Sequence, residues 1–162
     1  MRGYMPFPNA ELRIPIEYQE KMEAYTRTRP TGGSAPEPED APFPRQVDVW
    51  FLAVCLGVVH NRRVELQPSQ AHKFNTASML ESDPDRIEML ELIAIALTDD
   101  PYVIREPRRV IDIANELAAG GLPIVFTMLE EGNSRRIDNL SDKVQAMLIE
   151  VLPPPQPELV EA

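Results

Sequence analysis

The amino-acid sequence predicts an all-α protein: a compact bundle of five or six helices, with a tethered N-terminal helix and a mobile, proline-rich tail. Three observations predict this class. Residues 49–59 form an apolar run of a length that suits a buried core element. Residues 82–85 read Ser-Asp-Pro-Asp, which is typical of a helix start. Apolar residues in 137–151 recur at steps of three and four, which is the spacing of one helix face.

Length and composition restrict the class further. The 162 residues give room for one ordinary domain plus tails, and 43% of them are hydrophobic, which is enough to fold. The formal net charge of −10 argues against a protein that coats nucleic acid by bulk attraction, but it allows a local basic patch. The single cysteine, Cys55, lies in the apolar run and cannot form an internal disulfide. We expect a buried, inert thiol, in keeping with a reducing compartment.

The sequence predicts a cytoplasmic location. Residues 1–10 contain two prolines and lack the apolar stretch of a signal peptide. No uninterrupted apolar stretch approaches the length of a transmembrane helix.

Four parts follow one another along the chain. We predict an N-terminal segment and helix over residues 1–28, a linker over 29–42, a helical domain over 43–152 and a disordered tail over 153–162. The linker holds four prolines, two glycines and three acids in fourteen residues, a composition that cannot build a packed core.

The N-terminal segment combines two patterns. Leu12, Ile14 and Ile16 alternate with other residues, which favours a short extended piece. Pro15 then begins a predicted helix that runs to about Thr28 and has one apolar face. We expect this helix to pack on its own body in preference to a second chain.

The central helix is predicted within residues 43–63, since the apolar run is long for a strand. Pro44 suits a first helical turn, and Asp48 favours the positive end of the helix dipole. Residues 64–73 are predicted as a loop, and residues 74–80 as a short turn or helix.

Three further helical segments complete the bundle. The helix after Asp83 is apolar on more than one side from Leu92 to Leu97, so its second half is expected to be buried against the central helix. The next helix begins at Pro107, and Gly120-Gly121 is predicted to stop it before a new segment at Pro123. That segment is closed by Gly132-Asn133, and the last helix ends before residues 153–155.

Several kinds of chemistry lack the required motifs. His60 and His72 are separated by a predicted loop and do not have the spacing of zinc ligands. The sequence contains neither a Gly-x-Ser-x-Gly elbow nor a phosphate-binding loop. We therefore assign no catalytic residue, no metal site and no cofactor.

Acidic residues gather at two places where a nuclease could hold Mg²⁺. Both lie at predicted helix ends, where acids are also expected as caps or solvated charges. The second place is the less usual one, because a helix C-terminus disfavours acids. The acidic residues are Glu81, Asp83, Asp85, Asp99 and Asp100.

Arginines form three groups in this acidic chain. The guanidinium fork matches phosphate oxygens, and several of these arginines lie near predicted helix starts, where the dipole does not favour positive charge. Pairing with the chain's own acids, or with those of a partner, is the alternative. The predicted DNA-binding residues are Arg62, Arg63, Arg105, Arg108, Arg109, Arg135 and Arg136.

A family resemblance rests on four short motifs: Phe43-x4-Asp48, Ala53-x2-Leu56-Gly57, Asn61-Arg62-Arg63, and Glu-Leu-Ala-Ala-Gly-Gly-Leu at residues 116–122. Together they resemble small proteins associated with bacterial DNA phosphorothioation (Dnd-type) and related defence gene clusters. The second block of that family reads Glu-Tyr-Ala-Asn-Gly-Gly-Leu, so Leu117 and Ala119 depart from it. The resemblance covers residues 43–129.

The resemblance implies membership of a system that modifies DNA or restricts invading DNA, and it transfers no active site. Together with the missing catalytic motifs and the arginine groups, it predicts an accessory, non-catalytic subunit of a prokaryotic DNA phosphorothioation-type antiphage defence system, one that binds a larger protein partner and the DNA phosphate backbone. One alternative is a metal-dependent DNA-nicking component that uses Asp99, Asp100 or the acidic cluster around Asp83. A second alternative is a helical adaptor without DNA contact.

Overall fold

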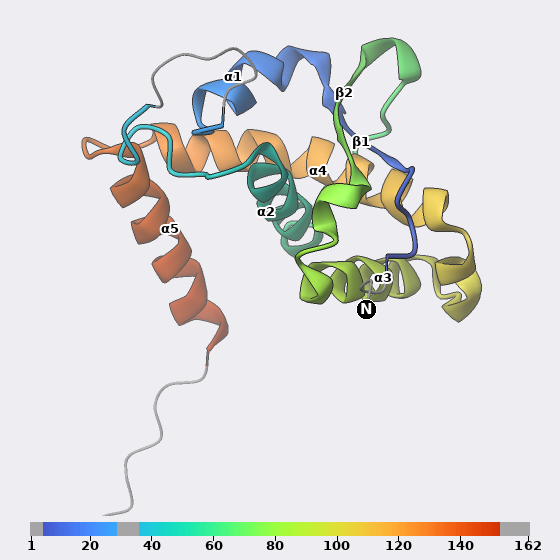
Figure 1. Ribbon diagram of the computed structural model, residues 1–162. Helices are drawn as coiled ribbons and strands as arrows, with labels where there is room; N and C mark the ends of the chain where they lie inside the picture. Colours follow the sequence, from blue (N-terminus) through green and yellow to red (C-terminus); the bar gives the residue numbers. More distant parts are fainter. Residues whose placement is uncertain (1–4, 29–35, 153–162) are drawn as a thin grey trace, which may run out of the picture.

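The computed structural model of the protein describes residues 5–28 and 36–152 (Figure 1). Residues 29–35 of the predicted linker and the predicted tail, 153–162, lie outside the described residues. Within them the fold is mostly helical, and it also contains one small antiparallel sheet, so it is not purely all-α. The helices and strands are β1 (Glu11–Pro15), α1 (Gln19–Ala24), α2 (Gln46–Val59), β2 (Ala71–Thr76), α3 (Pro84–Thr98), α4 (Pro107–Glu130) and α5 (Arg136–Val151).

The other elements are arranged around the long helix α4 (Figure 1). The central helix predicted from the apolar run is confirmed as α2, which crosses α4 and makes the most extensive packing in the molecule. Trp50 of α2 is fully buried. The core therefore lies where α2 meets α4, as expected for two apolar helices that cover each other.

The predicted helix stop at Gly120-Gly121 is wrong, because α4 continues through both glycines and through Pro123. Both glycines are buried: a Cβ atom at Gly121 would overlap with the carbonyl oxygen of Ala53 in α2, and one at Gly120 would overlap with the carbonyl oxygen of Arg62 just after α2. A glycine pair can mark a helix end or a close approach of two backbones, and here it marks the approach.

Because α4 is uninterrupted, it is long and apolar enough to span a membrane by length and composition, contrary to the prediction that no stretch approaches this length. However, 72% of its most apolar window is buried inside the molecule. This degree of burial is typical of a helix in a protein core.

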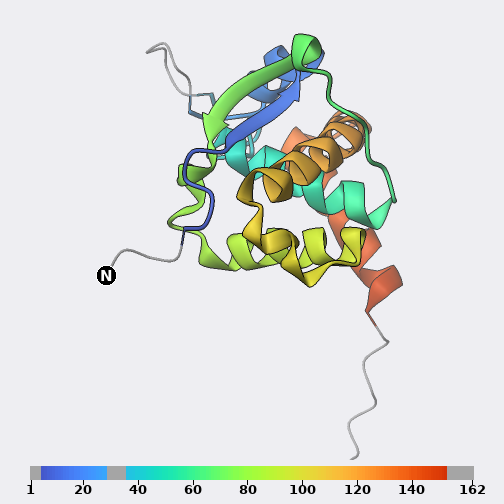
Figure 2. The same ribbon diagram turned by 90° about the vertical axis from the view of Figure 1, so that its right-hand side faces the viewer.

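The sheet pairs β1 with β2 above the helices (Figure 2). The extended piece predicted near Leu12 is confirmed as β1, whereas the loop predicted over 64–73 and the turn or helix predicted over 74–80 are wrong for residues 71–76. The residues of β2 are mostly polar and half-buried, so they lack the apolar alternation that signals a strand. Pairing with β1, distant in sequence, makes this segment a strand.

The N-terminal helix packs on its own body, as expected. The rings of Tyr18 and Tyr25 lie 5.5 and 5.8 Å from the ring of Phe126 in α4. The Lys21 ammonium lies 2.9 Å from the Glu130 carboxylate. The α-helix is shorter than predicted, since a 3-10 turn at Ile16–Tyr18 precedes it.

The described half of the predicted linker also packs on the body. Ala41 is buried, and the carbonyl of Glu39 accepts a hydrogen bond from the Ile137 N–H at the start of α5 (3.3 Å). Residues on both sides of the linker share one hydrophobic core. The linker therefore does not separate two cores.

The helix start predicted at residues 82–85 is confirmed by α3, but the predicted burial of its second half holds only for the inner side, where Ala94 is buried, and is wrong for the outer side. Leu92 is 63% exposed and Leu97 is 43% exposed. The predicted last helix is confirmed as α5, which packs through its first turns and then leads away from the body (Figure 1). Val151, in its last turn, is 78% exposed.

Candidate functional site

The seven predicted DNA-binding arginines do not form one surface. Arg105, Arg108 and Arg109 lie around the start of α4, while Arg135 and Arg136 lie beyond its end, at the start of α5. A helix of 24 residues separates these groups by about 36 Å.

Four of the seven arginines form ion pairs with acids of the chain. A guanidinium held by a carboxylate presents less net charge to a phosphate, although each exposed pair contributes only about 0–1 kcal/mol to stability. Arg105 is placed differently, 4.8 Å from the Tyr102 ring centre. The pairs are Arg63–Glu116, Arg109–Glu106 (3.3 Å), Arg135–Asp138 (3.1 Å), Arg135–Glu39 (3.2 Å) and Arg136–Asp40 (4.0 Å).

Arg108 lines two adjacent cavities, of about 380 and 590 Å³, between the start of α4 and the segment before β1. Their walls contain equal numbers of basic and acidic side chains, so the site lacks the excess positive charge of a phosphate-binding groove. The charged lining residues are Arg13, Arg108 and Arg109, with Glu11, Glu106 and Asp112.

Arg62 is exposed in the segment that follows α2. It shares a depression of about 300 Å³ beside α4 with Lys143 of α5 and with Glu131. The Lys143 ammonium lies 3.9 Å from the Glu131 carboxylate. Arg62 and Lys143, which come from different elements, thus line one depression together with a single acid, Glu131.

The acids considered for a metal-dependent nuclease do not converge. Asp83 precedes α3 and Asp99 follows it, so about 22 Å of helix separates them. Within residues 5–28 and 36–152, no group of three or more His, Cys, Asp or Glu side chains is placed to hold a metal ion.

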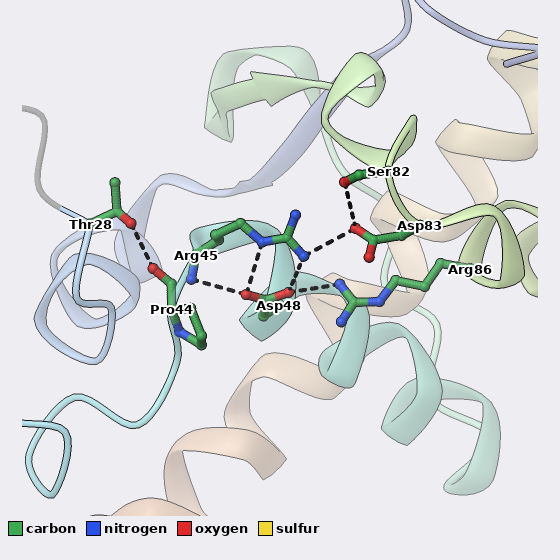
Figure 3. Close-up of polar contacts among 7 residues, drawn as sticks. All are labelled: Thr28, Pro44, Arg45, Asp48, Ser82, Asp83 and Arg86. Carbon is green, nitrogen blue, oxygen red and sulfur yellow. Dashed lines mark hydrogen bonds and ion pairs between the residues drawn. The ribbon is translucent and has the colours of Figure 1, made fainter. Parts of the chain in front are cut away.

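Asp83 instead belongs to a charged cluster that joins the starts of α2 and α3 (Figure 3). The Asp48 carboxylate accepts hydrogen bonds from the guanidinium groups of Arg45 and Arg86, both at 2.8 Å. Arg45 also donates to Asp83 at 3.0 Å. Burial raises the pKa of Asp48, but the hydrogen bonds from Arg45 and Arg86 outweigh it and lower the pKa below its ordinary value. A carboxylate held in this way ties two helices together and is a poor proton acceptor.

Sequence reasoning missed the two arginines of this cluster, because it considered only arginines that occur in groups. The available signal was Arg45 three residues before Asp48, a spacing at which a first-turn acid caps the helix. The Arg45 N–H donates to Asp48 at 3.0 Å, as that spacing predicts.

Asn115 of α4 is a second polar residue that the sequence did not reveal. Its side-chain oxygen accepts hydrogen bonds from the backbone N–H of Arg13 in β1 (2.9 Å) and from the indole N–H of Trp50 in α2 (3.2 Å). Its amide donates to the Glu11 carbonyl at 2.9 Å. One buried amide thus joins β1, α2 and α4. The need of a buried tryptophan N–H for an acceptor was the only signal.

Exposed apolar side chains gather on two helices. Such side chains mark interaction surfaces when they lie together on one face. On α3 and α5 the large apolar residues that are at least 38% exposed are Met89, Leu92, Leu97, Ile137, Leu148, Ile149 and Val151.

A family model described as DNA sulphur modification system-associated protein 4 matches residues 34–151, most of the chain. The chain belongs to this family. The predicted resemblance is therefore confirmed, and the match is longer than the predicted 43–129. It includes β2 and helices α2 to α5, and it begins after β1 and α1. Searches of curated proteins and of solved structures find no match.

The motifs that carry the resemblance to this DNA sulphur modification-associated family lie at contacts that hold the fold together. Gly57 and Gly121 lie where α2 meets α4, Gly120 lies against the backbone of Arg62 just after α2, and Asp48 lies in the charged cluster. The Arg62 N–H donates to the Gly57 carbonyl at 2.8 Å, where the chain leaves α2. These motifs maintain the fold, and the family description associates the chain with a DNA sulphur modification system.

Proposed function

We propose that this chain is an accessory, non-catalytic subunit of a prokaryotic DNA sulphur modification system of the antiphage defence type. It acts in the cytoplasm by binding a larger protein component of that system. Family membership supports its place in such a system. The observation that carries the proposed binding of a partner is the exposed apolar surface of α3.

An apolar surface of this kind has a physical cost. A helix that is apolar on two sides is usually covered on both, and α3 is covered on one. Leu92 at 63% exposure leaves most of its side chain in water, and covering that remainder contributes about 1–2 kcal/mol, the corresponding share of the value for full burial. Contact with another protein would recover this free energy. The exposed last turns of α5 offer a smaller surface of the same kind.

The charges also favour a protein over DNA as the main partner. The chain has a net charge of −10, and four of the seven candidate arginines are held by carboxylates. Binding to duplex DNA depends chiefly on positive groups that displace counterions from phosphates. This chain has few such groups that its own acids leave available.

Contact with DNA phosphates is the second part of the proposal, and we place it at Arg62. Together with Lys143 it lines one depression, so two positive side chains from separate elements lie beside each other. We expect this contact to add to the affinity of a complex that a protein partner has already assembled.

Co-expression tests the proposed function. The full chain, tagged, is produced with each protein component of the sulphur modification gene cluster of its own genome, and purified complexes are weighed by native mass spectrometry. We expect one larger component to co-elute in a fixed ratio. If each component fails to bind, alone and in combination, the proposed function is wrong. A tagged acidic protein of similar size is the control for nonspecific retention.

A further inference from the structure

Helix α3 presents two different apolar stripes. Ile87, Leu90 and Ala94 are buried against the body. Met89, Leu92 and Ala96 are exposed on the opposite side, at the spacing i, i+3 and i+7. This is the spacing at which one helix face meets another helix.

Acids lie at both ends of the outer stripe. Asp85 and Glu88 are exposed at its start, and Asp99 is exposed just after its end. The only basic side chain of α3 is Arg86, which is turned to Asp48 at 2.8 Å and lies over the Phe51 ring. The outer face is therefore apolar in the middle and negatively charged at its ends.

We propose that this outer face of α3 docks an amphipathic helix of the partner protein, one whose apolar stripe is flanked by Lys or Arg. The inference rests on the proposed function and specifies where and how the partner binds. The outer face of α3, from Asp85 to Asp99, is about 21 Å long, which matches a partner helix of about fourteen residues. Basic residues at the ends of that helix meet the acids and fix its register.

The same charges disfavour two other occupants. A second copy of the chain, packed through its own α3, would bring acids at 85, 88 and 99 close to acids of the same kind. An anionic membrane surface would be repelled by the same acids. A basic amphipathic helix satisfies both the apolar centre and the acidic ends.

Three variants of the full chain test the docking. Leu92→Glu places a charge at the centre of the outer face, and Glu88→Lys reverses the sign of the charge at one of its ends. Ile16→Glu is the matched control, because Ile16 is 58% exposed but lies in the 3-10 turn before α1, where it lines a depression with residues 64–67 and not with α3. All three positions are exposed, so circular dichroism and thermal melting should match those of the unmodified chain.

The measurement is calorimetric titration of each variant with the component that co-elutes with the unmodified chain. We expect Leu92→Glu to weaken binding at least 30-fold, Glu88→Lys to weaken it about fivefold to tenfold, and Ile16→Glu to leave it unchanged. Hydrogen exchange should show new protection of residues 85–99 in the complex.

Each other outcome overturns the inference in a recognisable way. Unchanged affinity for Leu92→Glu would mean that the partner binds elsewhere, and the proposed function would stand. A dimer of the free chain that Leu92→Glu dissociates would assign the face to a second copy. Binding to anionic vesicles that Leu92→Glu abolishes would assign it to a membrane. If each component fails to bind the unmodified chain, the proposed function fails together with the inference.

Discussion

Gly121 of α4 lies directly against the backbone carbonyl of Ala53 of α2, so that a Cβ atom at position 121 would overlap with the carbonyl oxygen. A Cβ at Gly57 would in turn overlap with the Leu117 carbonyl oxygen. The two helices therefore approach each other through glycines contributed by both. This close crossing positions Trp50 and the rest of the core.

Replacement of Gly121 by alanine tests this crossing, because helix propensity and close packing predict changes in stability of opposite sign. Helix propensity alone would stabilise the variant by about 1 kcal/mol. We expect instead a loss of at least about 2 kcal/mol in the free energy of unfolding, because the added methyl group would collide with the backbone of Ala53, which cannot rotate away as a side chain can. Urea denaturation measures the difference. Ser141→Ala, on the exposed face of α5, should change stability by less than about 0.5 kcal/mol. A higher melting temperature for Gly121→Ala would contradict the packing described.

Asn115 is predicted to be the most sensitive polar residue of the core. Asn115→Leu removes the partners of the Trp50 indole N–H, the Arg13 N–H and the Glu11 carbonyl together. We expect a loss of about 2–4 kcal/mol, since each buried unsatisfied group costs about 1–3 kcal/mol and the sites relax in part. Denaturation followed by Trp50 fluorescence measures this loss. Asn133→Ala, in the exposed turn after α4, is the control and should be nearly neutral.

The charged cluster predicts a pH dependence of stability. Because the folded pKa of Asp48 lies below its unfolded value, the cluster stabilises the protein above about pH 4, and this contribution is lost as the pH falls through the folded pKa. Asp48→Asn should cost about 1–3 kcal/mol at pH 7. The difference from the unmodified chain should shrink as the pH falls below about 4. Denaturation curves from pH 2 to 7 test this, and a difference independent of pH would rule out the ionic contribution.

Two neighbouring arginines are predicted to differ in their effect on DNA binding. Arg62 lines the depression with Lys143, whereas Arg63 is held by Glu116. In the partner-bound complex, Arg62→Ala should weaken binding to duplex DNA about threefold to tenfold and lower the dependence on salt, while Arg63→Ala should have a smaller effect. Fluorescence anisotropy at several salt concentrations measures both. Equal losses for the two variants would remove the special role of Arg62.

The sequence was sufficient for those elements whose own residues determine them. The apolar run with Asp48 in its first turn predicted α2, and the residues around Pro84 predicted the start of α3. The strand β2 could not be predicted, because its polar residues become a strand only by pairing with β1. The glycines at 120 and 121 were misread, because a helix stop and a close helix crossing share one sequence signal. Deciding between them requires the position of Ala53.

The candidate site was predicted only in part. The sequence identified arginines as candidate contacts and gave pairing with acids as the alternative, but the partners of Arg63 and Arg135 depend on the tertiary fold. The sequence predicts that Leu92 is buried, because an apolar residue on a second helix face is normally covered, but Leu92 is exposed. A residue that departs from this rule on a well-formed helix is a reason to expect a binding partner.

The most direct test of whether this subunit works through protein contact is the persistence of its complex without DNA. The co-expressed complex is treated with nuclease and passed over a sizing column in about 0.5 M salt, where the Debye length is below about 8 Å and DNA-mediated association is strongly weakened. We predict that the chain still elutes with its partner, and that Leu92→Glu releases it. Release of the unmodified chain by nuclease would show that DNA holds the complex together, and would contradict the proposal.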